Sequence, residues 1–414
     1  MNDTEPIPIL IISDAPSSTT GLGRITRDLA VRMNESLKDI CRVATLGYGG
    51  AGSRKLGFQQ YVIEGMSEWI IPTLPEIWED FAGKQKGICM TIWDASRLMW
   101  LSQPARCEML GPYQVLRNWL MQAPFRLWGY FPIDASGPND KLTYPLHQTL
   151  LGFDRILAYG KWAKGVVEQT IGSDAAKVRN LDWLPHGIDT SVFYERNRPV
   201  CRYKFGSITK AQTLQRGPRL GSVLSDEILI GIVATNQARK NWALGIKTVA
   251  LLAKKHKVRL WIHTDGLERN WSIPSMLVDY NLVDKAAISL GILSDDEMAQ
   301  AYSACNLTLG IGSEGFGFPL AESQACGTPV ITGSYAGGAE LVQDKMRVEP
   351  IAYQDEGLFT CKRPVFQASD WAMSAEQWMG KRVALNPQYN WNNLWPNWEK
   401  WVIEGINCIN FKGV

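Results

Sequence analysis

Two carboxylates stand close together in the segment of the chain that is richest in candidate functional residues. Glu314 precedes a short glycine turn, and Glu322 follows it by eight positions. A helix is predicted to begin at Pro319, because proline is favoured at the first helical position. Glu314 then lies in the loop before this helix and Glu322 one turn into it, so both can face a ligand at the helix start. Gly315 and Gly317 let backbone amides approach that ligand without a side chain between them.

A pair of cations forms a second candidate group. Arg239 and Lys240 follow an apolar run at residues 228–233 and precede a helix predicted to begin near Trp242. In a parallel α/β sheet this position is the carboxyl edge, where ligands bind. Two adjacent cations at such an edge can balance the charge of a phosphate. A solvated pair at a helix start is the alternative.

A glycine loop near the N-terminus is the third candidate. Gly21 and Gly23 lie between a strand-like run at residues 7–12 and a helix-like stretch at residues 24–33. Unpaired amides and the positive dipole end of a helix favour a phosphate at such a loop. A dinucleotide fingerprint would need a further glycine at Thr26, so the loop does not indicate an NAD enzyme.

The elements that must position these residues form a repeating strand and helix pattern. Short, continuous apolar runs are typical of parallel strands buried on both faces. They occur at residues 7–12, 41–46, 87–93, 126–131, 155–159, 228–233, 258–262, 307–309 and 329–331. Helix-compatible stretches alternate with them, among them residues 243–256, 295–303 and 319–326. The pattern predicts an α/β fold of two successive domains, with the seam between Tyr194 and Ser225.

The seam between the two predicted domains is strongly basic. From Tyr194 to Arg219 the chain carries seven arginines and lysines against one acid, Glu195. A solvated linker explains such a run. Contact with phosphate or nucleic acid is the alternative.

Composition excludes several classes of protein. The 414 residues are 45% hydrophobic and 20% charged with a net charge of +2, which is typical of a globular chain and indicates no polyanionic partner. No Cys-x-x-Cys and no Asp-x-Asp occurs, so neither a zinc site nor a bound catalytic metal is expected. Apolar runs fall short of the roughly 18 residues of a membrane span, and the first five residues lack the basic start of a secretory signal. A cytoplasmic protein without a transmembrane segment is therefore expected.

The element from Glu314 to Glu322, with Gly-Phe-Gly inside it, resembles the signature of family 4 retaining glycosyltransferases with the GT-B fold. Further stretches that resemble the same family lie at residues 185–193, 239–241, 291–298 and 337–342. The resemblance implies two Rossmann-like domains that face a central cleft, with a C-terminal helix that crosses back to the first domain. The domains expected are an acceptor-side domain at 1–194, a basic linker at 195–225, a nucleotide-sugar-binding domain at 226–385 and a helical segment at 386–414.

The family implies a role for each carboxylate and for the glycine turn between them. Glu322 would bind the ribose hydroxyls of a nucleoside diphosphate sugar. Glu314, with Gly315 and the backbone amides around Phe316 and Gly317, would hold the hydroxyls of the transferred sugar. The resemblance thus implies a donor site at the start of one helix, with Glu314 also in a catalytic role.

The family also implies that Arg239 and Lys240 bind the diphosphate in a catalytic role, and that Gly21 and Gly23 approach it from the first domain. A departing nucleoside diphosphate gathers negative charge, which fixed cations and backbone dipoles stabilise without a metal. The nucleoside diphosphate sugar is then a co-substrate, and no metal or other cofactor is expected. The chain departs from the family at Thr235, where many relatives carry an arginine.

The acceptor side has three candidate residues. The family often places a histidine near the sugar in the first domain, but no histidine occurs before residue 147. Asp94 and Asp134, each at the end of a predicted strand, are candidates for that position, Asp134 with a catalytic role. A helix cap or a loop acid is the alternative for either aspartate. His186, just before the seam, is a candidate for donor contact or for a structural turn.

A row of aromatic residues lies near the C-terminus. Trp391, Leu394, Trp395, Trp398 and Trp401 fall on one helical stripe. A platform for carbohydrate is one interpretation of such a row. Core packing is predicted instead, because the family ends in a helix that returns to the first domain.

The resemblance implies a retaining, metal-independent glycosyltransferase that moves a hexose or pentose from a nucleoside diphosphate sugar to an acceptor hydroxyl. Two alternatives stay open. The first is a nucleotide-sugar-binding protein without transferase activity, and the second is a glycosyltransferase that acts on a modified nucleic-acid base. The second rests on the basic seam and on four tryptophans of the first domain, Trp93, Trp100, Trp119 and Trp128. The acceptor, whether glycan, lipid, protein, small molecule or nucleic acid, is not named by the sequence.

Overall fold

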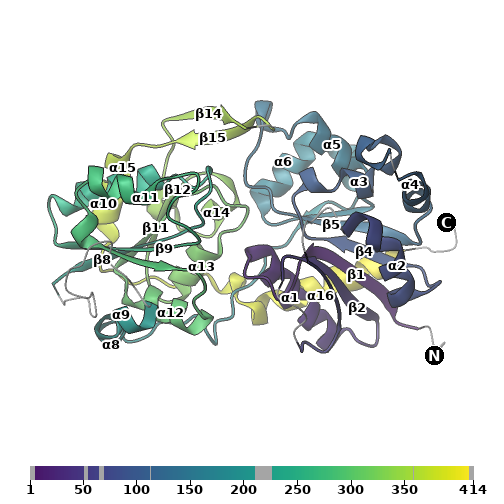
Figure 1. The fold of residues 1–414 in the computed structure, drawn as a ribbon, viewed down its shortest axis with the longest axis horizontal. Coiled ribbons are helices and arrows are strands. Elements are labelled where there is room, and N and C mark those ends of the chain that lie inside the picture. Colours follow the sequence, from purple (N-terminus) through teal and green to yellow (C-terminus); the bar gives the residue numbers. More distant parts are fainter. Residues whose placement is uncertain are drawn as a thin grey trace. The chain divides into compact units, whose positions relative to one another are not determined.

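The chain forms two compact units in the computed structural model. Unit 1 comprises Met1–His186 and Trp395–Val414, and unit 2 comprises Gly187–Leu394 (Figure 1). The residues described are 5–50, 55–64, 70–111, 113–209, 226–357 and 359–409. The chain enters unit 2 at Gly187, a few residues before the boundary expected at Tyr194. The entering and the leaving segments are held together, because the amide of Ile188 donates to the carbonyl of Tyr389 over 2.7 Å.

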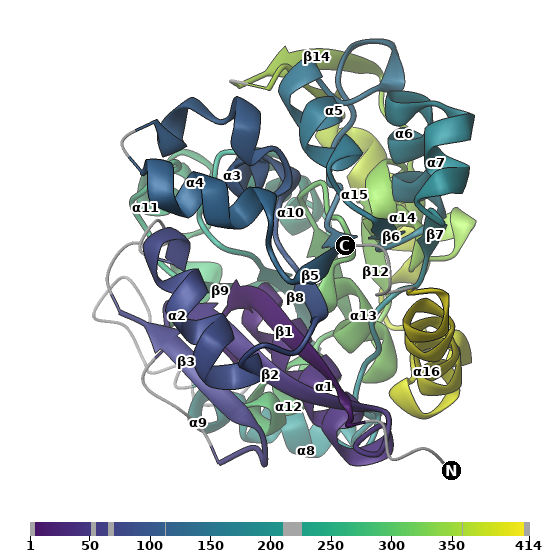
Figure 2. The same cartoon turned by 90° about the vertical axis from the view of Figure 1, so that its right-hand side faces the viewer.

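Unit 1 is built on a parallel sheet whose described strands have the order β3-β2-β1-β4-β5-β6-β7. These strands are β1 Ile7–Asp14, β2 Cys41–Tyr48, β3 Gln59–Ile63, β4 Gly87–Thr91, β5 Phe125–Phe131, β6 Arg155–Ala158 and β7 Asp182–Trp183. Figure 2 shows β1, β2 and the edge strand β3 side by side in purple. The apolar run predicted at residues 7–12 lies in β1, where Ile9 to Ile12 have no exposed surface.

Helices lie along the sheet of unit 1. They are α1 Gly21–Ser36, α2 Ile70–Ala82, α3 Met99–Ser102, α4 Gln114–Met121, α5 Tyr144–Leu151, α6 Lys161–Ile171 and α7 Ser173–Val178. The start of α1 is fixed by Thr20, whose hydroxyl accepts a hydrogen bond from the amide of Gly23 over 3.1 Å. A capping threonine of this kind satisfies one of the free amides at a helix start.

Unit 2 repeats the design with a second parallel sheet, whose described strands have the order β10-β9-β8-β11-β12-β13. These strands are β8 Ile228–Val233, β9 Val258–Thr264, β10 Ala286–Leu290, β11 Leu307–Gly310, β12 Val330–Gly333 and β13 Arg347–Val348. An antiparallel hairpin of β14 Ala352–Glu356 and β15 Cys361–Val365 follows. The strand order reverses between β8 and β11, as it does between β1 and β4 in unit 1. Both sheets therefore have the order of a Rossmann fold, in which ligands bind at the carboxyl ends of the strands beside this reversal.

The helices of unit 2 connect its strands. They are α8 Arg198–Tyr203, α9 Phe205–Thr209, α10 Trp242–Ala253, α11 Ile273–Asp279, α12 Asp295–Ala304, α13 Phe318–Ala325, α14 Ala336–Glu340 and α15 Ala368–Trp378. The sequence at the start of α12 explains its boundary. Ser294 and Glu297 form a capping box, in which each side chain accepts a hydrogen bond from the other residue's amide.

The described part of the basic seam, residues 195–209, contains both exposed and buried residues. Helix α8 packs against α12, and Arg202 is only 8% exposed. Its guanidinium donates to the carbonyl of Ala304, the last residue of α12, over 3.1 Å and to the carbonyl of Glu227 over 3.0 Å. A guanidinium can satisfy the free carbonyls at a helix end in this way, so Arg202 has a packing role within unit 2. Residues 210–225 lie outside the described residues.

The last helix, α16 Trp391–Cys408, belongs to unit 1 from Trp395 onward (Figure 1). Trp398 and Trp401 are 1% and 4% exposed. The indole nitrogen of Trp398 donates to the carbonyl of Pro185 over 2.8 Å, and the Trp401 ring lies 5.1 Å from that of Trp128. The stripe is therefore core except at Trp395, which is half-buried, and the predicted return of the C-terminal helix to the first domain is confirmed.

Within the described residues, no helix combines the length and the apolar character needed to cross a membrane.

Candidate active site

The strongest cluster of candidate residues lies in unit 2, beside the point where the strand order reverses. Arg239 and Lys240 lie in the loop between β8 and α10, and Glu314 lies in the loop between β11 and α13. Both loops follow the carboxyl ends of neighbouring strands. An isolated bridge between Lys240 and Gly312 joins the two loops.

The three charged side chains are in direct contact. The ammonium of Lys240 forms an ion pair with Oε1 of Glu314. Nη1 of Arg239 lies 3.4 Å from Oε2 of the same carboxylate and donates to the carbonyl of Ser313 over 2.7 Å. The side chain of Lys240 is 6% exposed, and those of Glu314 and Arg239 are 20% and 29% exposed. One carboxylate therefore holds two cations at the edge of the sheet.

The cations keep Glu314 ionised. Burial raises the pKa of this carboxyl, but Lys240 and Arg239 outweigh burial and hold the pKa below its ordinary value of 4.5. At neutral pH the cluster therefore carries two positive charges against one negative charge. An excess positive charge at the carboxyl edge of a parallel sheet can bind an anion such as a phosphate.

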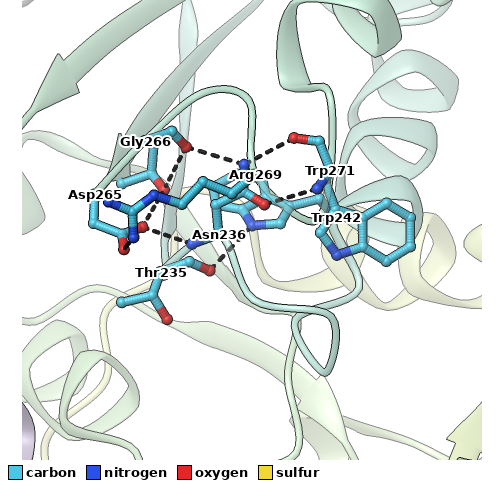
Figure 3. A network of polar contacts seen from close by, with 8 residues as sticks. Thr235, Asn236, Trp242, Asp265, Gly266, Arg269 and Trp271 are labelled. Atoms are coloured by element: carbon cyan, nitrogen blue, oxygen red, sulfur yellow. Dashed lines mark hydrogen bonds and ion pairs between the residues drawn. The ribbon is translucent and has the colours of Figure 1, made fainter.

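Asn236 holds the loop that carries the two cations (Figure 3). Its side chain donates to the carbonyls of Gly266 over 3.0 Å and Trp271 over 2.8 Å, and its Oδ1 accepts from the Trp271 amide over 2.9 Å. Its own amide donates to Oδ1 of Asp265 over 2.7 Å. Asn236 is 1% exposed, so these bonds form inside the unit. The role of Asn236 was not predicted from the sequence, because its partners lie on another loop, at Asp265, Gly266 and Trp271.

The glycine turn between the two carboxylates leads into α13. Gly317 is the residue before the helix and has a φ of 104°, a left-handed conformation that favours glycine. Pro319 lies in the first turn of the helix, as the sequence predicted. The amide of Gly338 donates to the carbonyl of Glu314 over 2.9 Å and fixes the turn from the next loop. Phe316 is 5% exposed and packs its ring 6.0 Å from that of Tyr389.

Glu322 is buried in α13, one turn after the start of the helix. Only 5% of the residue is exposed, and Oε2 accepts a hydrogen bond from the hydroxyl of Tyr302 over 3.1 Å. Burial, together with the charge of Glu322, raises the pKa of Tyr302 well above its ordinary value, so the phenol stays protonated. Tyr302 comes from α12 and fixes the orientation of the carboxylate, a role that the sequence analysis missed.

The carboxyl edge of unit 1 holds a buried carboxylate at the end of β1. Asp14 is 7% exposed. Its Oδ2 accepts from the hydroxyl of Thr20 over 2.5 Å and its Oδ1 from the indole nitrogen of Trp93 over 2.9 Å. Since Thr20 in turn caps the amide of Gly23, Asp14 holds the glycine loop in place. The sequence analysis did not identify Asp14, because the partners of this aspartate lie on separate elements.

The two glycines of this loop differ in their surroundings. Gly21 is exposed at the first position of α1. Gly23 is buried, and a Cβ there would meet the carbonyl oxygen of Ala15 at 2.6 Å. The absence of a side chain at Gly23 is therefore required by close packing of the loop on the end of β1.

Asp94 and Asp134 also lie at the carboxyl edge of unit 1. Asp94 is exposed just before a short 3₁₀ helix, Ala95–Arg97, and makes no side-chain cap there. Asp134 follows β5 and is half-buried. Both aspartates therefore follow neighbouring strands, as the sequence predicted.

His186 is packed inside unit 1. It is 1% exposed, and its Nδ1 lies 3.0 Å from the hydroxyl of Tyr130. Burial and the nearby charge of Arg24 hold the pKa of the imidazole well below its ordinary value, so it is neutral at pH 7. Tyr159, whose ring lies 4.8 Å from the imidazole, is 3% exposed. These contacts show His186 in a packing role.

Within the described parts of the chain, no three histidine, cysteine, aspartate or glutamate side chains come together in a way that could hold a metal ion.

Comparison with known proteins agrees with this geometry. Residues 227–360 match the family described as "Glycosyl transferases group 1". A D-inositol 3-phosphate glycosyltransferase from Mycobacteroides abscessus is 25% identical over 214 residues, which are 50% of this chain and 41% of that protein. The match thus spans less than half the length of this relative.

Solved structures resemble the whole fold. A sucrose-phosphate synthase from Thermosynechococcus elongatus has a TM-score of 0.69 and 14% identity, over 97% of this chain and 100% of that chain. Anabaena HepE in complex with UDP-glucose has a TM-score of 0.62 and 11% identity, over 97% and 100% of the two chains. The fold is therefore GT-B, and the match to the glycosyl transferases group 1 family lies within its second unit.

Proposed function

We propose that the protein transfers a sugar from a nucleoside diphosphate sugar to an acceptor hydroxyl, without a metal and with retention of the anomeric configuration. The observation that carries the proposal is the cluster of Arg239, Lys240 and Glu314 at the carboxyl edge of the sheet in unit 2. This cluster lies inside the matched residues 227–360. The complex of a GT-B neighbour with UDP-glucose supports a nucleotide sugar as the donor.

The donor is held along α13. Glu322, oriented by Tyr302, accepts hydrogen bonds from the ribose hydroxyls with its second carboxylate oxygen. Glu314 and the backbone amides from Gly315 to Gly317 hold the hydroxyls of the sugar. The positive end of the helix favours the diphosphate at its start.

The leaving diphosphate is stabilised by Arg239 and Lys240. As the bond between the anomeric carbon and the phosphate oxygen breaks, the electron pair of that bond moves to the phosphate. Two fixed cations stabilise this charge without reorganisation during the reaction. Metal independence follows from this arrangement as part of the proposal.

Retention is proposed for a transfer on one face of the sugar. The acceptor oxygen bonds to the anomeric carbon on the side from which the phosphate leaves, and its proton passes to a phosphate oxygen. Glu314 is paired with two cations, so its charge is already engaged and it is not assigned as the nucleophile. Asp134 and Asp94 remain the proposed acceptor-side residues, whereas His186 is assigned to packing because it is 1% exposed.

Three of the four tryptophans that suggested a nucleic-acid acceptor give it no support, whereas the fourth, Trp119, is half-buried. Trp93, Trp100 and Trp128 are 2%, 4% and 1% exposed and belong to the core of unit 1, so they offer no stacking surface. In the seam, Arg196 pairs with Asp296 at 2.8 Å.

The experiment is a donor panel. UDP-, GDP- and ADP-sugars are incubated with the protein in excess EDTA, and release of the free nucleoside diphosphate is measured. The proposal predicts release from one donor class that EDTA does not abolish. Binding of a nucleotide sugar without release would indicate the inactive binding protein, and release restored only by magnesium or manganese would contradict metal independence.

A further inference from the structure

We infer that a cavity in unit 2, beside the proposed donor site, binds a neutral mono- or disaccharide as a separate ligand. The cavity has a volume of about 350 Å³. Its floor is the end of β11 and the following residues, Gly310 to Ser313, and the hairpin of β14 and β15 contributes a wall. The volume lies at the small end of ligand pockets, which span about 300–1,000 Å³, and suits a mono- or disaccharide.

The hairpin presents one polar face to this cavity. Gln354 pairs in register with Arg363, and both line the cavity together with Glu356. Successive strand residues point to opposite faces, so Asp355, between Gln354 and Glu356, belongs to the other face. The hairpin thus supplies amide, carboxylate and guanidinium groups at one wall.

The guanidinium that the hairpin brings to the cavity is paired with a carboxylate of the same hairpin. Nε of Arg363 lies 3.3 Å from Glu356. An anionic ligand at this wall would have to compete with the Glu356 carboxylate. A neutral ligand rich in hydroxyls can instead hydrogen-bond to the paired charges and to the amide of Gln354, as hydroxyls both donate and accept.

Aromatic rings supply a further part of the lining, and two of them are held in place by hydrogen bonds. The indole nitrogen of Trp271 donates to the carbonyl of Gln237 over 3.1 Å, and the hydroxyl of Tyr335 donates to the carbonyl of Lys362 over 2.6 Å. Rings fixed in this way offer apolar faces to the C–H face of a sugar ring at little entropic cost.

Two further aromatic rings line the cavity. Trp371 is 1% exposed, and its ring lies 5.7 Å from that of Phe366. These rings add to the apolar part of the lining.

The cavity is distinct from the proposed donor position. Glu322 and the turn from Gly315 to Gly317 are not among the described residues that line it, whereas Arg239 lies at both. Binding of a neutral sugar here can therefore be measured without any donor, and the inference is testable even if the proposed transfer is not observed.

The test measures binding of glucose, galactose, N-acetylglucosamine and maltose by saturation-transfer NMR and calorimetry. The variants are Gln354→Ala, on the cavity face of the hairpin, and the matched control Asp355→Ala, on the opposite face. Both residues are exposed, so neither change removes a core contact. A third variant, Glu322→Gln, changes the proposed donor position alone.

We expect at least one of these sugars to bind to the wild-type protein. Its affinity should be about tenfold lower for Gln354→Ala and unchanged for Asp355→Ala and Glu322→Gln. Absence of binding of all four sugars at about 100 mM, well above a 1 mM dissociation constant, would overturn the inference. Sugar binding that is unchanged in Gln354→Ala would place the sugar outside this cavity and overturn the inference as well. Displacement of the sugar by inorganic phosphate would show an anion site instead.

Discussion

Replacing Lys240 with methionine removes a charge from the candidate active site and keeps most of the aliphatic chain. That chain is closely packed, because a Cβ on Gly312 would meet Cδ of Lys240 at 2.5 Å. Lys240 is only 5% exposed, so methionine can occupy the same space. Lys240→Met therefore tests the charge separately from the packing.

We expect Lys240→Met to lower both the free energy of unfolding and kcat. The substitution leaves the Glu314 side chain, 20% exposed, with Arg239 as its cation at 3.4 Å. Breaking a fully buried ion pair costs about 3–5 kcal/mol, and partial exposure with one cation retained reduces this to about 1–2 kcal/mol of unfolding free energy. Losing one group that stabilises charge in the transition state lowers kcat by about 10²–10³, or about 2.7–4 kcal/mol.

The assay compares kcat with the dissociation constant of the donor, measured by calorimetry, after urea unfolding has shown that the variant is folded. Lys257→Met is the matched control. Like Lys240, Lys257 pairs with a carboxylate of unit 2, that of Asp226 at 2.8 Å, but the Lys257 side chain is 55% exposed. We expect the control to keep its kcat, whereas Lys240→Met loses far more in kcat than in donor affinity.

Two results would count against this reasoning. If kcat is retained and only the KM for the donor rises, Lys240 anchors the ground state and does not act on the leaving group. If Lys240→Met and Lys257→Met behave alike in both quantities, the cluster is not the diphosphate site.

Three further predictions concern carboxylates. Glu322→Gln should weaken nucleotide binding by about 1.5–3 kcal/mol, the range for a hydrogen bond to a charged group, and unchanged affinity by calorimetry would exclude the ribose role. Since the folded-state pKa of Glu314 lies below 4.5, its contribution to stability is present above that pH and lost as the pH falls through the folded-state pKa. The free energy of unfolding in urea should therefore differ between wild type and Glu314→Gln by an amount that shrinks in acid. A difference that grows in acid would contradict this prediction. Asp14→Asn should lower the free energy of unfolding by about 1–3 kcal/mol, because two hydrogen bonds end on this buried carboxylate. The control Asp39→Asn changes an exposed aspartate and should leave the free energy of unfolding unchanged. Equal effects of the two substitutions would refute the argument.

The sheets could be predicted from the sequence because buried parallel strands leave a local signal. The apolar run at residues 228–233 has the same bounds as β8, and the runs at 7–12 and 41–46 lie within β1 and β2. Such runs are continuous because both faces of a parallel sheet are covered. The hairpin of β14 and β15 was missed, since its residues are half-buried or exposed and its run is interrupted by charged residues.

The charged cluster could also be predicted, because Arg239, Lys240 and Glu314 each follow a strand that the sequence already indicates. The residues that hold such groups in place could not. Asn236 and Tyr302 act through partners 35 and 20 positions away in the chain. Contacts of this range depend on how the elements pack, which periodicity and local motifs do not record.

The direct test of the central claim is a crystal structure of the protein with the nucleoside diphosphate that the donor panel selects. The account predicts phosphate oxygens within about 2.7–3.2 Å of Lys240 Nζ or of the Arg239 guanidinium, with the ribose hydroxyls on Glu322. A nucleotide whose phosphates lie away from both cations, or whose ribose does not reach Glu322, would contradict the account.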